Sequence, residues 1–352
     1  PTYRMSGDEN NSPRGRLLLW RAEEEGRLEP DVWTDHYTAE CVGCLACQSV
    51  CPANVPYDLI LERTRHRHRE AGRVKVGWLI RLATWAVRWP KLFAGAMLPA
   101  RLARRIGLRP HPLFFHGKPA VWESTADYAR AQVEKHQPTG STVALLKGCL
   151  MEAAFREINF ATVRVLVRHG YRVIVPEGQG CCGALHEHTG SSGVEELFAQ
   201  NRSAFAKAAP VAVVTNSAGC GLALSKALKD ALPVKDLSAF LVEGPLKAMD
   251  NRDQRIKVYV DLPCHLVHGQ HQRIPAALLD ASGYDWQWAP CAEDCCGSGG
   301  VYNLQNPENA RRILEEKAAF LETVPLDRHP VIATANHVCM MQWSSARQFI
   351  RR

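Results

Sequence analysis

The sequence predicts an α/β protein in which two copies of a cysteine-rich α/β unit follow a helical, ferredoxin-like N-terminal module. Three observations lead to this fold class: a dense run of cysteines near the N-terminus, a cysteine pattern that occurs twice in the second half, and β-like runs that alternate there with helical periodicity. The expected parts are the N-terminal module, a basic helical linker and two cysteine-rich domains, at residues 1–70, 71–140, 141–250 and 254–352.

The 13 cysteines are the unusual part of the composition of this 352-residue chain. They stand in tight runs and in two adjacent Cys-Cys pairs. Neighbouring cysteines rarely form a disulfide with each other, because the bond needs a wider Cα separation than one trans peptide supplies. We therefore interpret them as reduced, metal-binding cysteines of a cytoplasmic protein. No apolar run approaches the roughly 18 residues that a membrane-spanning helix needs.

The first cysteine run is the most specific motif. It comprises Cys41, Cys44, Cys47, Cys51 and Pro52, which is the spacing of bacterial ferredoxins that bind 4Fe–4S clusters. A zinc site is the alternative, although zinc sites usually pair two Cys-x-x-Cys motifs across a longer loop. In two-cluster ferredoxins the fourth cysteine of a run ligates the other cluster. We therefore expect Cys51 to serve a second cluster, whose own cysteine run lies upstream of Pro1 in a longer protein.

The second half of the chain contains an internal repeat. In each copy a β-like run leads to a cysteine, Cys-Cys-Gly follows, and a second β-like run leads to a last cysteine. These cysteines are Cys149, Cys181, Cys182 and Cys220 in the first copy, and Cys264, Cys295, Cys296 and Cys339 in the second. The β-like runs are 142–146, 211–215, 257–261 and 331–334. The shared order and similar spacing indicate a duplication.

Helical periodicity separates these runs, and we predict helices over 152–169 and 308–323. Strands that alternate with helices form mainly parallel sheets, whose sites lie at the carboxyl ends of the strands. In both copies cysteines follow a predicted strand, so they are expected at that edge. A thiolate bound to iron is deprotonated and suits a low-potential electron carrier. Zinc in place of iron, and ordinary core cysteines, are the alternatives.

The repeated pattern resembles the cysteine-rich CCG domain that occurs in heterodisulfide reductases and in the iron–sulfur subunits of glycolate, lactate and anaerobic glycerol-3-phosphate dehydrogenases. Over nearly its whole length the chain is most similar to the iron–sulfur subunits of glycolate oxidases. The stretches that support this resemblance are Ser12-Pro-Arg-Gly-Arg16, Cys41 to Pro52 followed by Val55-Pro-Tyr57, Cys181-Cys-Gly-Ala-Leu-His186-x-His188, Pro263-Cys-His-Leu-x-His268 and Cys295-Cys-Gly-Ser-Gly-Gly-Val-Tyr-Asn-Leu304.

The chain departs from the family motif at the end of each copy. The family ends in Cys-x-x-Cys, whereas this sequence has Ser217 before Cys220 and Asn336 before Cys339. Each copy thus keeps four cysteines, and the resemblance implies one 4Fe–4S cluster per copy in place of the non-cubane double cluster of heterodisulfide reductase. At His337 the family usually has a small residue.

The resemblance implies an electron-transfer subunit of a glycolate (2-hydroxy-acid) dehydrogenase complex. Flavin-containing partner subunits would oxidise the substrate, and the clusters would pass electrons toward a quinone or similar acceptor. No dinucleotide-binding fingerprint occurs here, since Gly297-Ser-Gly-Gly300 follows a cysteine pair and not a strand. The alternatives are an iron–sulfur subunit of D-lactate or glycerol-3-phosphate dehydrogenase, a heterodisulfide-reductase-like enzyme that acts at a CCG cluster, and a zinc-stabilised scaffold.

Further residues near the motifs have two interpretations. The histidines beside the cysteines either tune or ligate iron, or they are ordinary packing residues; they are His186, His188, His265 and His268. Cys291 lies outside the motifs and is expected to be a buried thiol.

The net charge of +7 is concentrated in one segment. Residues 62–118 contain 14 Lys or Arg against two acids, with three tryptophans, Trp78, Trp85 and Trp89, among them. The segment is expected either to dock a partner subunit or to lie on the anionic inner face of the plasma membrane. Nucleic acid is not the expected partner.

Overall fold

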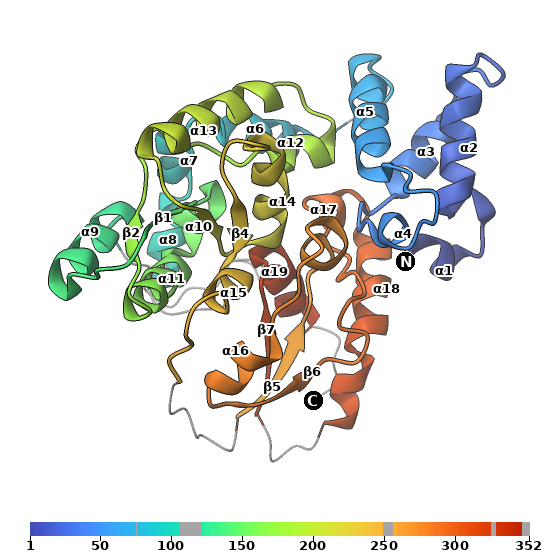
Figure 1. Cartoon of the computed structure of the whole chain (residues 1–352). Coiled ribbons are helices and arrows are strands. Elements are labelled where there is room, and N and C mark those ends of the chain that lie inside the picture. Colours follow the sequence, from blue (N-terminus) through green and yellow to red (C-terminus); the bar gives the residue numbers. More distant parts are fainter. Residues whose placement is uncertain (75, 106–121, 249–255, 325–328, 347–352) are drawn as a thin grey trace.

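The computed structural model describes residues 1–74, 76–105, 122–248, 256–324 and 329–346. It has the mixed α/β architecture that the sequence predicts, with two parallel sheets preceded in the chain by a helical N-terminal region (Figure 1). Residues 1–70 are called the N-terminal module, residues 142–241 the first unit and residues 256–345 the second unit.

The N-terminal module is helical throughout. Trp20 and Tyr57 pack with their ring centroids 5.6 Å apart, and the Trp20 indole donates a hydrogen bond of 2.8 Å to Thr38 Oγ1. These rings form a small core with Leu61 and Cys41, so the first cysteine of the run is packed among the helices of the module. The elements are α1 (Thr2–Ser6), η1 (Glu9–Asn11), α2 (Pro13–Glu24), α3 (Val32–Glu40), α4 (Ala46–Ser49) and α5 (Tyr57–Glu70).

Four helices connect this module to the first sheet: α6 (Trp78–Ala86), α7 (Pro90–Ala96), α8 (Leu98–Arg105) and α9 (Thr125–His136). These helices also contribute side chains to the core of the first unit. Val87, just after α6, is buried against Cys181 and Cys182, and Phe93 of α7 packs on the same cluster. Ala129 of α9 is buried with residues of the first sheet.

The first unit contains a four-stranded parallel sheet in the order β2-β1-β3-β4. One difference from the sequence prediction is a break in the helix predicted over 152–169. Phe155 leaves helical geometry with φ −133° and ψ 38°, and its side chain is buried with Met151. The elements are β1 (Thr142–Leu145), α10 (Cys149–Ala154), α11 (Arg156–Arg168), β2 (Arg172–Ile174), α12 (Ala184–Thr189), α13 (Val194–Ala208), β3 (Val213–Thr215), α14 (Ala218–Ala227), β4 (Val234–Asp236) and α15 (Leu237–Leu241).

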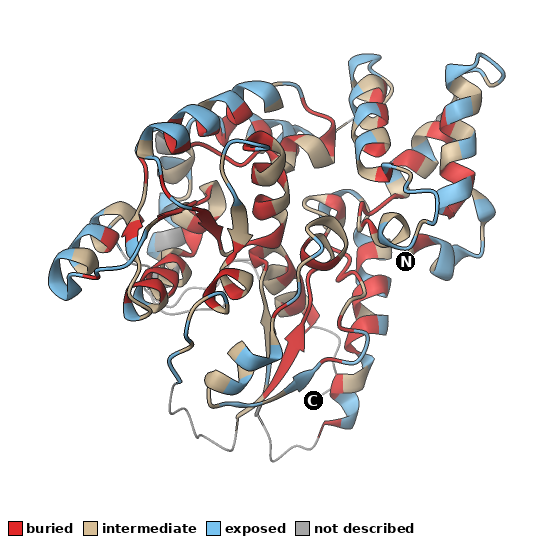
Figure 2. Ribbon diagram, viewed as in Figure 1, coloured by how far each residue is buried: buried red, intermediate tan, exposed pale blue. Residues whose placement is uncertain are grey.

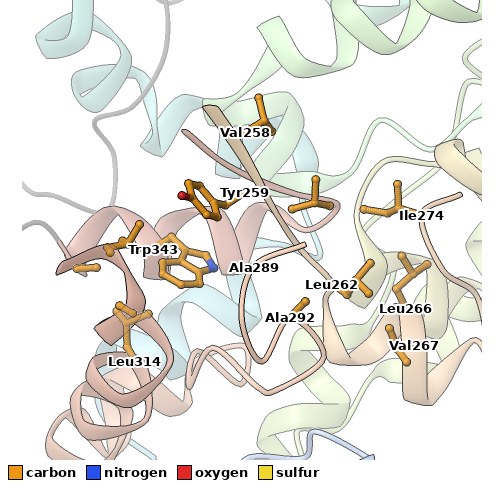
Figure 3. Packing of buried hydrophobic residues seen from close by; sticks show 14 of the residues in the cluster. Val258, Tyr259, Leu262, Leu266, Val267, Ile274, Ala289, Ala292, Leu314 and Trp343 are labelled. Carbon is orange, nitrogen blue, oxygen red and sulfur yellow. The ribbon is translucent and has the colours of Figure 1, made fainter. Parts of the chain in front are cut away.

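The second unit contains a three-stranded parallel sheet in the order β6-β5-β7. Val258 and Tyr259 of its central strand β5 form one buried cluster with Leu314 and Trp343 of the covering helices (Figure 3). The elements are β5 (Ile256–Asp261), η3 (His265–Gly269), α16 (Ala276–Ala281), β6 (Asp285–Trp288), α17 (Tyr302–Gln305), α18 (Pro307–Ala318), η4 (Ala319–Thr323), β7 (His329–Thr334) and α19 (His337–Ser345).

The central strands β1, β3 and β5 are largely buried, whereas strand β6 at the edge of the second sheet is largely exposed (Figure 2). The residues of β1 from Val143 to Leu145 are fully buried, as is Val260 of β5. Because each parallel sheet is covered by helices, the loops at the carboxyl ends of its strands are where side chains of different elements can meet.

Candidate functional site

All eight cysteines of the two Cys-Cys-Gly copies line one cavity of about 360 Å³. They come from both units, so the two repeats contribute to a common space. The lining includes Cys149, Cys181, Cys182, Cys220, Cys264, Cys295, Cys296 and Cys339, together with Ser217, Asn336 and His337.

The loops at the carboxyl ends of the strands position these thiols as the repeat predicts. Cys149 begins α10 after β1, and Cys220 lies in the first turn of α14 after β3. Cys264 follows β5, and Cys339 lies in the first turn of α19 after β7. Unpaired backbone N–H groups at a helix N-terminus favour a thiolate at both positions, but at Cys339 a hydrogen bond from Cys296 is outweighed by burial, and the pKa of the thiol is raised.

The glycine of each Cys-Cys-Gly turn is required by its backbone. Gly183 has φ 95° and Gly297 has φ 84°, in the left-handed region that favours glycine. A Cβ on Gly183 would come within 2.8 Å of the Phe198 ring, and one on Gly297 within 2.7 Å of the Ala310 carbonyl. These close approaches place the turn of the first unit against α13 and that of the second unit against α18.

The thiols crowd one another inside each copy. Cys149 Sγ lies 3.5 Å from Cys181 Sγ, and this hydrogen bond together with burial raises the pKa of Cys149 well above its usual value. In the second unit a hydrogen bond with Cys295 and burial likewise raise the pKa of Cys264. Several buried thiolates side by side repel each other unless a cation compensates them, so this donor set suits a metal centre.

Each copy contributes four thiols, buried or half-buried, to the shared cavity. Among the described residues, no group of three or more His, Cys, Asp or Glu side chains could hold a single metal ion.

Two buried side chains that sequence reasoning missed hold the Cys-Cys-Gly turns. In the first unit, Asn201 accepts a hydrogen bond from the Gly180 N–H at 3.0 Å and donates one to the Cys181 carbonyl at 2.8 Å. In the second unit, Lys317 donates to the Ala292 carbonyl at 3.1 Å and pairs with Asp261, both nearly inaccessible to solvent. In the sequence, only the position of Asp261 at the end of a β-like run indicated this pair.

The N-terminal run reaches the second unit. Cys44 packs in one apolar cluster with Cys264 and Cys295. Burial, followed by the charge of Cys264, raises the pKa of Cys44 to about 11, and burial with the neighbouring Cys44 and Cys41 raises that of Cys47 to about 12. The three thiols Cys41, Cys44 and Cys47 therefore gather at the boundary between the N-terminal module and the second unit.

Two arginines set the environment of Cys41. Burial acts to raise the pKa of its thiol, but Arg16 and Arg65 outweigh burial and hold it below the usual value. Arg65 also donates a hydrogen bond of 2.5 Å to the Cys41 carbonyl, and the Tyr57 hydroxyl lies 3.5 Å from Cys41 Sγ. Arg16 is buried and bonded to Asn11, so it supports the module from inside.

Cys51 lies on a different side of the run. With Cys47 it lines an open hollow of about 440 Å³ beside α2, whose other walls include Pro13, Leu17 and Tyr57. Cys51 therefore shares its surroundings with Cys47, whereas Cys44 packs toward the second unit.

The four histidines beside the motifs fall into two groups. His188 and His265 line the cysteine cavity and stack on each other, with ring centroids 5.1 Å apart and planes within 2°. His265 Nε2 lies 3.0 Å from the Gly43 carbonyl, which ties the second unit to the N-terminal run. His186 is buried, and His268 bonds Ser49 Oγ at 2.8 Å; neither lines the cavity.

Cys291 was expected to be buried, and that prediction is wrong. Its side chain is exposed, in the loop after β6, where its backbone has a φ of 54°. The strand ends before it, and the turn directs the thiol to solvent.

A charged cluster joins α5 of the N-terminal module to the first unit. Lys226 Nζ lies 2.5 Å from Glu62, 3.3 Å from Glu187 and 3.6 Å from Asp58. Three carboxylates around one ammonium leave an excess of negative charge at a half-buried boundary. Burial chiefly, with Glu187 next, raises the pKa of Glu62 to about 7.

The raised pKa of Glu62 predicts that the stability of the folded chain depends on pH, and Glu62→Gln should remove this contribution. The unfolded chain loses the Glu62 proton near pH 4.5, whereas the folded chain holds it to about pH 7. Stability should therefore fall as pH rises through this window, by about 2 kcal/mol. The variant should flatten the dependence of the urea midpoint between pH 5 and 7.5, while Glu243→Gln, which alters an exposed pair with Lys235, should keep it. An unchanged slope in Glu62→Gln would contradict the assignment.

Comparison with known proteins agrees with this geometry. The cysteine-rich domain family, CCG, matches residues 143–225 and 258–344. The chain is 32% identical to the probable glycolate oxidase iron–sulfur subunit of Bacillus subtilis, over 97% of this chain and 85% of that protein. It is 28% identical to the glycolate oxidase iron–sulfur subunit of Escherichia coli, over 98% and 87%. A fumarate reductase (CoM/CoB) subunit of Methanothermobacter marburgensis is 32% identical over 54% of this chain and 40% of that protein.

Proposed function

Because this chain belongs to the family of glycolate oxidase iron–sulfur subunits, we propose that it is the electron-transfer subunit of a glycolate (2-hydroxy-acid) dehydrogenase complex. The observation that supports this role most directly is the convergence of both cysteine sets on one cavity, next to the N-terminal run. Closely spaced thiol sets are what successive electron carriers require.

The thiols divide into three candidate sites for 4Fe–4S clusters. Cys41, Cys44 and Cys47 would contribute to one, with Cys51 serving a further cluster. The first unit would hold a second through Cys149, Cys181, Cys182 and Cys220, and the second unit a third through Cys264, Cys295, Cys296 and Cys339. Such clusters accept and release single electrons at potentials set by burial, charge and hydrogen bonds to sulfur.

The chain's own residues would control those potentials. The cavity walls are largely apolar, including Phe93, Met97 and Leu304, and exclude water from the sulfurs. The Gly297 N–H donates to Cys295 Sγ at 3.4 Å. Arg16 and Arg65 supply positive charge at Cys41. Donors and cations near sulfur stabilise the more negative, reduced state.

The packing of the N-terminal module suggests an order of transfer. Cys44 shares an apolar cluster with Cys264 and Cys295, so the run lies nearest to the second unit. We infer that electrons pass between the N-terminal run and the second unit, and between the two units across the shared cavity. Flavin-containing partner subunits would be the donors, and a quinone or similar acceptor would receive the electrons.

The isolated chain should not oxidise glycolate. Its sequence has no dinucleotide-binding fingerprint, so the flavin that removes a hydride is expected on another subunit. The measurement is glycolate-dependent dye reduction by purified, iron-loaded chain, with dithionite-reduced protein as the control that its clusters pass electrons to the dye. Glycolate oxidation without added flavoprotein would contradict the assignment of the flavin to another subunit. Reduction of a heterodisulfide would favour the reductase alternative.

We further infer that helix α6 provides a surface for an anionic membrane. Its inner face, with Ile80 and Thr84, is buried. Its outer face is also apolar, since Trp78, Leu82 and Trp85 follow helical spacing and are 71%, 50% and 52% exposed. A helix that is apolar on both faces needs a partner for the outer one.

Charge favours a lipid surface as that partner. The sequence has ten Lys or Arg and no acidic residue between Glu70 and Glu123, and Arg81 is exposed beside the tryptophans. Tryptophan, leucine and basic residues together are typical of helices that lie in the headgroup region. In the described parts of the chain, no helix has the length and apolarity to cross a membrane. Contact would thus be peripheral, on the cytoplasmic side; residues 106–118 of the predicted segment lie outside the described residues.

A further inference from the structure

Ser217 and Asn336 occupy equivalent places in the two copies, three residues before the last cysteine of each. Their side chains meet across the boundary between the units. The Ser217 hydroxyl donates a hydrogen bond of 3.0 Å to Asn336 Oδ1, and the Ala218 N–H donates one of 2.9 Å to the Ala335 carbonyl. Both side chains line the cysteine cavity, and their exposed fractions are 1% and 9%, so water competes little for these bonds.

The contact continues to sulfur in the second unit. Asn336 Nδ2 donates to Cys339 Sγ at 3.2 Å. His337 Nδ1 lies 2.9 Å from Ser217 Oγ and supplies a further polar contact. One short path of polar atoms therefore links Ser217 of the first unit to a thiol of the second.

We propose that Ser217 and Asn336 are positioning residues that couple the two units, so that the redox potential of the second cysteine site depends on a side chain of the first unit. This inference rests on the proposed iron–sulfur function. An electron passes from one cysteine site to the other, and Ser217 and Asn336 are not chemically changed in the transfer.

The physical reason lies in hydrogen bonding to sulfur. A donor to a ligating thiolate stabilises the reduced site, which bears the extra negative charge, and so raises its potential. The Ser217 hydroxyl polarises the Asn336 amide, which in turn donates to Cys339, and hydrogen bonds in such a chain strengthen one another. Removing the hydroxyl should therefore act at Cys339 through Asn336.

The test is a redox titration of the iron-loaded full chain, followed by electron paramagnetic resonance. Signals are first assigned to the units with Cys182→Ser and Cys296→Ser. In Ser217→Ala the potential of the second unit should fall; a tenfold weaker preference for the reduced state corresponds to about 59 mV for one electron. Ser217→Thr keeps the hydroxyl and should restore that potential. Asn336→Ala should lower the potential of the second unit as well.

Ser225→Ala is the matched control, because Ser225 is a serine of α14 that bonds the Leu222 carbonyl at 2.7 Å and does not line the cavity. It should leave both potentials unchanged. A shift confined to the first unit in Ser217→Ala, or none, would refute the coupling while leaving the iron–sulfur function intact. Loss of iron in Ser217→Ala would instead make Ser217 a ligand and also overturn the proposal. Wild-type chain that binds no iron and sulfide would refute the proposed function itself.

Discussion

Replacing Cys296 by serine should remove the iron of the second unit and destabilise that unit. The thiol is buried among Cys295, Cys339 and the Asp261–Lys317 pair, so little else can take its place. Loss of one 4Fe–4S cluster lowers the iron content by about four per chain. Because metal binding contributes directly to folding free energy, the unit should also unfold at a lower temperature. Iron and sulfide analysis and the absorbance near 400 nm measure the first effect.

Cys182→Ser should have the same effect on the first unit and spare the second. Cys291→Ser is the matched control, since this cysteine is exposed and lies outside the motifs. It should keep the full iron content and the same thermal midpoint. Wild-type iron content in both Cys182→Ser and Cys296→Ser would show that these thiols are not ligands.

The second large effect concerns the outer face of α6. Replacing Trp78, Leu82 and Trp85 together by serine should reduce binding to vesicles that contain anionic lipid at least tenfold. Burial of one such side chain contributes about 1.5–3 kcal/mol, and about 1.4 kcal/mol corresponds to a factor of ten. Sedimentation with vesicles of mixed phosphatidylglycerol and phosphatidylcholine measures the bound fraction. Binding of the unmodified chain should also weaken as salt is added, because basic residues contribute to it.

Trp33→Ser controls for the loss of an exposed tryptophan elsewhere. Trp33 is 65% exposed on α3 of the N-terminal module and should not affect vesicle binding. If the triple variant binds vesicles as well as the unmodified chain does, the lipid proposal fails. If it also loses association with the flavin subunits, the surface docks a protein partner instead.

Much of the fold could be predicted from local patterns. The short apolar runs before Cys149, Cys220, Cys264 and Cys339 are strands β1, β3, β5 and β7, shifted by at most two residues at an end. Alternation of strand and helix predicted parallel sheets, since parallel neighbours need a crossover of this length. Gly183 and Gly297 could also be anticipated, because a crowded turn after two cysteines favours a residue without Cβ.

Other features depended on contacts between distant parts of the chain. Phe155 breaks a helix whose periodicity continues through it, because its side chain is buried beside Met151. Nothing near Lys317 in the sequence indicated that a lysine would be buried against Asp261, 56 positions earlier. Cys291 lies outside the motifs, and its exposure depends on where its loop directs it.

The types and order of the candidate ligands are properties of the sequence alone, because Cys-x-x-Cys-x-x-Cys and Cys-Cys-Gly are local spacings that constrain local geometry. By contrast, the meeting of the two cysteine sets in one cavity does not follow from these local spacings. Two α/β units of this kind could be joined in many orientations, and the packing of their helices selects one. Only that packing brings Ser217 to Asn336 across 119 positions, and Cys44 to Cys264 and Cys295. Local spacing therefore specifies what each site can bind, while tertiary contacts specify which sites are neighbours.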